Sequence, residues 1–149
     1  MKLVHLLSTF SGRIGRGSWW LGFAVTIAAS IVGSLLIDPG IWRAVPPRAP
    51  KALLTLWEIV LTVPATAITV KRFNDRDWPN WLGYAIGAIN IVFILAQQSG
   101  YLVDDPETAP VREQLAFILL GAVWLFTLID SGFVKGTSGP NQYGPDPIM

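Results

Sequence analysis

The residues that could do chemistry are concentrated in one short stretch. Residues 71–77 read KRFNDRD, and five of these seven are charged, in a chain of 149 residues of which only 14% are charged. Asp75 and Asp77 alternate with basic residues, a pattern that favours an ordered network of charge-assisted hydrogen bonds. Such a network suits the recognition of a lipid phosphate or of an acidic segment of a partner protein.

Two other segments and one intramembrane acid supply side chains of the same kind. Arg13 and Arg16 lie in SGRIGRG, and Asn141 and Tyr143 lie in a tail rich in glycine and proline. Asp130 lies near the end of a long apolar run. We predict one composite site at the cytoplasmic face, and its members are Arg13, Arg16, Arg72, Asp75, Asp77, Asp130, Asn141 and Tyr143.

Specific pairings follow from charge within this site. We expect the two N-terminal arginines to approach Asp75 or Asp77. Arg72 is expected to pair with Asp130, for which Lys135 is the alternative partner, and the two tail residues should cover the group. The competing interpretation is that each motif only stabilises the end of its own helix.

A second candidate site lies deeper in the apolar segments and consists of Glu58, Asn90 and Gln97. Glu58 and Gln97 both lie about 9 Å from the outer ends of their segments, so a hydrogen bond between them is expected. Glu58 is either a buried packing residue or a proton or cation site. Glu58 and Asp130 differ by about 15 Å in depth, which excludes a paired carboxylate centre.

Signatures of common enzymes and cofactor sites are missing. The chain has no cysteine and one histidine, His5, and it contains neither GxSxG nor HExxH. SGRIGRG lacks the order of a dinucleotide-binding GxGxxG motif. We therefore predict no catalytic residue, no metal and no cofactor. The net charge of +1 says nothing for or against a nucleic-acid partner, and we predict none.

The elements that must position these residues are long apolar helices. Segments 18–37, 52–70, 80–103 and 114–134 each approach or exceed the roughly 20 residues that an apolar helix needs to cross a bilayer. They predict an all-α membrane protein, a single domain over 1–149, with four transmembrane helices in a compact bundle. Recurring small residues, including Gly22, Gly83 and Gly87, should mark the helix contacts. The segment MKLVHLLSTF predicts a short interfacial helix before the first span.

The distribution of basic residues predicts the orientation. With four spans, the two termini and KRFNDRD share one side, which carries Lys2, Arg13, Arg16, Lys71, Arg72, Arg76 and Lys135. The other side carries Arg43, Arg48, Lys51 and Arg112. Because short basic loops stay in the cytoplasm, both termini should be cytoplasmic, in a multi-pass protein. At the inner span ends, Trp19, Trp20, Trp78 and Trp81 are expected as headgroup-level anchors.

Three segments together resemble a known family. They are FSGRIGRGSWW at 10–20, VKRFNDRDWPNW at 70–81 and GTSGPNQYGPDP at 136–147. They are similar to the DUF805 family of small bacterial inner-membrane proteins, over almost the whole chain. Lys71 and Asn74 stand where that family favours arginine and histidine. The resemblance implies a four-span inner-membrane protein without an established activity, and it supplies no catalytic residues.

Three functions are compatible with these residues. The first is a non-enzymatic interaction or regulatory module that binds lipid or a partner at its cytoplasmic face. The second is a small oligomeric transporter or channel that uses the intramembrane polar residues. The third, a lipid-processing enzyme, is disfavoured because only Asp75, Asp77 and Asp130 lie at headgroup level. Membrane lipids are the expected partners, with a protein partner or a second copy of the chain as further options.

Overall fold

The computed structural model describes residues 2–38, 51–102 and 109–147. These residues form the helices α1 (Leu3–Ser8), α2 (Arg16–Ile37), α3 (Lys51–Asp75), α4 (Trp81–Gln98) and α5 (Val111–Gly132). Over the described ranges there is no strand, only an isolated bridge between Asn141 and Gly144 in the tail. The four longer helices are long and apolar enough to cross a membrane. The predicted all-α class, with four helices long and apolar enough to span a membrane, is therefore confirmed.

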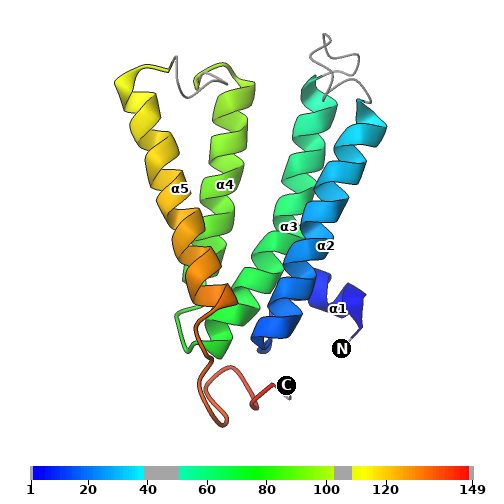
Figure 1. Cartoon of the computed structure of the whole chain (residues 1–149), viewed down its shortest axis with the longest axis vertical. Coiled ribbons are helices and arrows are strands. Elements are labelled where there is room, and N and C mark those ends of the chain that lie inside the picture. Colours follow the sequence, from blue (N-terminus) through cyan, green and yellow to red (C-terminus); the bar gives the residue numbers. More distant parts are fainter. Residues whose placement is uncertain (1, 39–50, 103–108, 148–149) are drawn as a thin grey trace.

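The four long helices alternate in direction (Figure 1). In that view α2 and α3 run side by side, α4 and α5 lie on the opposite side, and the ribbons diverge toward one end. The other end gathers α1, the start of α2, the α3–α4 connection, the end of α5 and the C-terminal tail. We call it the motif end. The helix α3 packs along α1, α2 and α4, whereas α5 has less contact with α2 and α3. A compact bundle stays a prediction.

Small residues set the close contacts of α3. A Cβ added at Gly83 would lie 2.9 Å from the Cα of Val70, closer than real Cβ atoms approach. A Cβ at Gly87 would collide with Thr66, and one at Gly22 would lie 2.8 Å from a methyl carbon of Ile68. The predicted role of these three glycines as helix-contact positions is confirmed.

The helix bounds differ from the predicted spans at one end of α3. Residues 71–75 were predicted to lie in a connection, but α3 continues through them to Asp75. The apolar segment ends where these charged residues begin, but the helix does not end there. It continues because hydrogen-bonding partners from other elements surround the charged side chains. In the third span, α4 ends at Gln98, and residue 103 of the predicted range lies outside the described residues.

The short helix α1 lies against the motif end of α2 and α3. Leu6 is buried together with Ile14, Trp19 and Ile68, whereas Leu3 and Val4 are exposed. The expected helix in this segment is present, and its location at a membrane interface stays a prediction.

Candidate functional site

Residues 71–75 form the buried centre of the motif end. Lys71, Arg72, Asn74 and Asp75 are each no more than 2% exposed. Buried charges are stable only when they are paired and hydrogen-bonded, so their partners determine what this cluster does.

Arg72 uses its guanidinium entirely within the protein. Its Nε donates to the carbonyl of Ser131 at 2.7 Å, and its terminal nitrogens reach the carbonyls of Ile14 and Val134. Its ion-pair partner is Asp75, one turn further along α3. The predicted pair between Arg72 and Asp130 is therefore wrong. Because α3 stays helical here, Asp75 lies on the same face of the helix as Arg72.

Asp130 pairs with a different arginine. Arg76 Nε lies 3.2 Å from its Oδ1, and Arg76 also donates to the carbonyl of Lys135 at 2.5 Å. The alternative partner, the Lys135 side chain, forms no ion pair with Asp130 in the described part of the chain. Asp77 lies outside the cluster, in a left-handed conformation (φ 58°), and accepts from Gln142 at 3.1 Å.

Arg13 links the N-terminal segment to both other motifs. Its Nη2 lies 2.9 Å from Asp75 Oδ1, and both side chains are almost fully buried. It also donates to the carbonyls of Thr137 and Gly139, each at 2.7 Å. The expected approach of Arg13 to Asp75 is thus observed. Arg16 instead donates to the carbonyl of Phe133 at 3.2 Å, so its expected pairing with Asp75 or Asp77 is wrong.

The tail covers the cluster as expected for Asn141. Its Nδ2 donates to the carbonyl of Asn74 at 2.8 Å, and its Oδ1 accepts from the backbone N–H of Tyr143. The backbone of Thr137 donates to the carbonyl of Asp75 at 2.8 Å. Tyr143 lines an open surface pocket beside Asn74 and Tyr84. The three motifs therefore do meet, and most of their polar groups bind one another.

Five successive carbonyls, of residues 131–135 at the end of α5 and just after it, accept from side chains of other elements. Arg72 binds those of Ser131 and Val134, and the carbonyls of residues 132, 133 and 135 accept from Trp20, Arg16 and Arg76. The last carbonyls of a helix lack intrahelical partners and carry partial negative charge, so cationic donors stabilise them. The basic residues of the motifs thus fasten α5 to α2 and α3.

Lys71 has a role that the sequence did not indicate. Its ammonium donates to the carbonyls of His5 and Leu6, at the end of α1, and lies 3.4 Å from the Thr9 hydroxyl. It therefore caps α1, in the same way that the arginines cap α5. Because its acceptors are carbonyls brought from 65 residues away, only the fold reveals this function.

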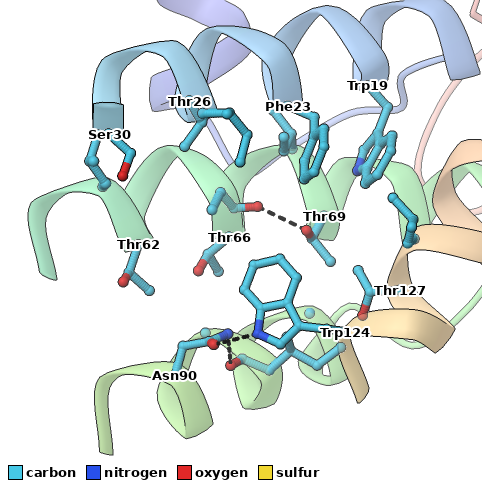
Figure 2. Close-up of a pocket in the computed structure, with 18 of the residues that line it drawn as sticks. Trp19, Phe23, Thr26, Ser30, Thr62, Thr66, Thr69, Asn90, Trp124 and Thr127 are labelled. Carbon is cyan, nitrogen blue, oxygen red and sulfur yellow. Dashed lines mark hydrogen bonds between the residues drawn. The ribbon is translucent and has the colours of Figure 1, made fainter. Parts of the chain in front are cut away.

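A partly open cavity of 490 Å³ lies between the four long helices (Figure 2). Its wall is mostly apolar and includes Glu58 and Asn90 of the predicted intramembrane site, but not Gln97. No hydrogen bond joins Glu58 to Gln97 in the described residues; Gln98 reaches α3 instead, through Thr55 at 2.8 Å. The predicted pair is wrong because equal depth does not place two residues on facing sides of their helices. Asn90 accepts from Trp124 Nε1 at 3.1 Å.

Comparison with known proteins places these features in a family. The model of DUF805, described as a protein of unknown function, matches residues 7–145. The chain belongs to the DUF805 family. The matched region contains every residue of the charged cluster and of the cavity wall.

Two relatives of this DUF805 protein, both from Escherichia coli, are uncharacterized proteins. The uncharacterized protein YiiR of Escherichia coli K12 is 30% identical, over 98% of this chain and 90% of its own length. YiiR of Escherichia coli O157:H7 matches with the same figures. No solved structure matches the chain. The chemistry of this DUF805 member must therefore be argued from its own geometry.

The cavity of this DUF805 protein is less polar than its residue names suggest. Thr26, Thr62, Thr69 and Thr127 each donate to a carbonyl one turn earlier in their own helix. Their hydroxyls are therefore engaged with the backbone, and their methyl groups add to the apolar surface. Among the described residues, no three histidine, aspartate or glutamate side chains are grouped to hold a metal ion.

Trp19 lies in the cavity wall, although the sequence predicts that it is a membrane-interface anchor. Trp19 was expected at headgroup level, yet it is only 2% exposed and lies in the cavity wall. Trp78 and Trp81 are exposed, as anchors require. A tryptophan pair at a span end does not show which ring points inward, so the sequence could not separate these roles.

Proposed function

We propose that this protein is a non-enzymatic lipid-binding module of the bacterial inner membrane, with both termini in the cytoplasm. The cavity between the four long helices would hold an acyl chain of a membrane lipid. The motif end would fasten the helices that enclose it. Family membership supports a protein without an assigned activity, and the four spanning helices support a membrane location.

The main support for this proposal is the cavity itself. Its volume of 490 Å³ falls within the range of about 300–1,000 Å³ that is typical of small-molecule pockets. Its wall is mostly apolar, and it lies along helices that would be surrounded by lipid. Acyl chains are the apolar groups present at high concentration in a bilayer, which makes them the best-matched occupant.

The motif end is a weaker candidate for a lipid-phosphate or protein-binding surface. Such a surface needs free cationic groups, but the Arg13 and Arg72 side chains are at most 1% exposed and are bound within the protein. Lys71 is likewise buried and binds the end of α1. We therefore interpret the composite site as a structural cluster that holds the helices together. The charged groups that a protein partner could contact at this end are mainly Arg16, Lys135 and the exposed acids.

A transporter or channel is the second candidate, because Glu58 and Asn90 both line the cavity. Against it, four of the threonine hydroxyls are engaged with their own helices, which leaves few polar groups along a path. A solute flux into liposomes that Glu58→Gln abolishes would favour this alternative.

The proposal can be tested by a substitution that fills the cavity with a larger side chain. Ser30 lines it from α2, and Ser34, one turn further along the same helix, does not. We expect Ser30→Phe to weaken retention of phosphatidylglycerol about tenfold, because overpacking of about 1–3 kcal/mol opposes the occupant. Ser34→Phe should retain lipid like the wild type. Native mass spectrometry from mild detergent measures lipid retention and oligomeric state together.

Equal retention by both variants would contradict a cavity-bound lipid. A wild-type protein that retains no lipid in detergents that preserve its fold would contradict the module itself. A bound protein or a second copy of the chain, in place of lipid, would shift the function toward the interaction module.

A further inference from the structure

One buried donor in the cavity wall has no partner. The indole Nε1 of Trp19 is buried and forms no hydrogen bond, whereas those of Trp20 and Trp124 bind Gly132 and Asn90. Trp57 Nε1 is likewise unpaired, but Trp57 packs beside Gly33 and does not line the cavity. Buried polar groups without a partner are rare in proteins, and each one requires an explanation.

The Trp19 ring is fixed in place. It stacks on Phe23, with ring centroids 5.2 Å apart and planes 10° apart, and it meets Trp20 edge-on at 5.1 Å. Leu6 and Ile68 belong to the same buried cluster. Figure 2 shows the indole at the cavity wall with its nitrogen on the edge nearer Thr69. A rotation of the ring to find a protein acceptor would break this packing, so the acceptor must come to the ring.

The surroundings define the chemistry of that acceptor. An indole N–H only donates, so the ligand must present an acceptor atom. No lysine or arginine lines the cavity, and its single ionisable wall residue is the acid Glu58. An ionised phosphate or carboxylate beside Trp19 would be a buried charge without a counterion, which is strongly unfavourable. A neutral carbonyl oxygen fits.

We propose that Trp19 Nε1 donates a hydrogen bond to the ester carbonyl oxygen of an acyl chain held in the cavity. This inference rests on the proposed lipid-binding function and names the group that positions the lipid. Trp19 is the fourth residue of α2, at the motif end, about 5 Å along the helix from its start. That level is close to the membrane interface, where the ester groups of phospholipids join their chains.

The experiment compares two lipids that differ only in their ester carbonyl groups. Ester-linked and ether-linked phosphatidylglycerol with identical chains compete for the full-length protein in mild detergent, and native mass spectrometry counts each bound form. We expect the wild type to prefer the ester lipid about threefold to tenfold, the effect of one net hydrogen bond. Trp19→Phe keeps an aromatic ring but loses the donor, so it should bind both lipids equally.

Trp57→Phe is the matched control, since it removes the other unpaired indole N–H outside the cavity. It should keep the ester preference. If Trp19→Phe fails to fold, the wild-type comparison still tests the proposal, and the infrared ester band of the bound lipid should lie below that of the same lipid in detergent.

Each outcome separates this inference from the proposed function. Equal binding of the two lipids by the wild type would overturn the ester contact and leave the lipid-binding module standing. Binding of neither would overturn both. Free palmitic acid that displaces the ester lipid from the wild type but not from Trp19→Phe would assign the acceptor to a fatty acid and overturn the ester.

Discussion

At the scale of single residues, two neighbouring arginines have opposite environments. The Arg13 side chain is 1% exposed and pairs with Asp75, whereas Arg16 is exposed and makes one hydrogen bond, to Phe133. Exposed polar contacts contribute little to stability, but removing one partner of a buried pair is costly because the other charge is left behind. The two arginines should therefore differ sharply when mutated.

A double-mutant cycle tests this difference. We expect Arg13→Ala and Asp75→Ala each to destabilise the protein by about 3–5 kcal/mol, with a coupling energy of about 1–3 kcal/mol between them. Arg16→Ala should cost about 1 kcal/mol or less and add to Asp75→Ala within about 0.5 kcal/mol. Unfolding in detergent, followed by circular dichroism, measures all five variants. Additive Arg13 and Asp75 effects would contradict a shared network.

The sequence could predict which residues meet at the motif end but not all of their pairings. Opposite charge and location on the same side of the membrane were sufficient to predict the contact between Arg13 and Asp75. They failed for Arg72, because its partner depends on whether residues 71–75 are helical. They failed for Glu58 and Gln97 as well, since residue counting gives depth in the membrane but not rotation about the helix axis.

At the scale of helices, the contact between α3 and α4 depends on the absence of side chains. Val70 and Thr66 of α3 occupy the space that a Cβ of Gly83 or Gly87 would need. Lipid does not drive apolar helices together, so such close packing is a main source of their association. Gly121 on α5 differs, since a Cβ there would have no atom within 4 Å.

Alanine at these glycines should therefore have opposite effects. We expect Gly83→Ala to destabilise the protein by about 1–3 kcal/mol, because the backbone of Val70 must shift. Gly121→Ala should be neutral or stabilising by up to about 1 kcal/mol, since alanine favours the helix. Thermal unfolding of both variants in the same detergent makes the comparison. Equal effects would show that the Gly83 contact is not a tight one.

The helices were the part of the structure that the sequence predicted best, for a physical reason. Four predominantly apolar segments of about 20 residues have few structural solutions, because every backbone polar group in a membrane must be satisfied within the helix. The end of α3 was missed because its charges, which would be costly in lipid, are stabilised by carbonyls from α1, from α5 and from the segment that follows α5. Those acceptors are distant in sequence.

At the scale of the whole molecule, the motif end and the cavity have different roles. Side-chain donors from α2, α3 and the loop after it bind carbonyls at the end of α5 and in the segment that follows it, and Lys71 binds those at the end of α1. Toward the other end the ribbons of α2 and α5 diverge in the view of Figure 1, while Thr55 of α3 and Gln98 of α4 stay hydrogen-bonded. The cavity between the four long helices is the space that the proposed lipid would occupy.

The orientation of the protein in the membrane depends on the distribution of basic residues along the whole chain. By sequence, seven basic residues fall in the termini and in the segment between the second and third spans, and four fall in the two other connections. Short loops rich in lysine and arginine remain in the cytoplasm, so the motif end and both termini should be cytoplasmic. We expect a reporter enzyme that is active only in the periplasm to be inactive when fused after Met149. Fused after Pro110, at the start of α5, it should be active. The reverse pattern would invert the orientation, and activity at both positions would contradict four spans.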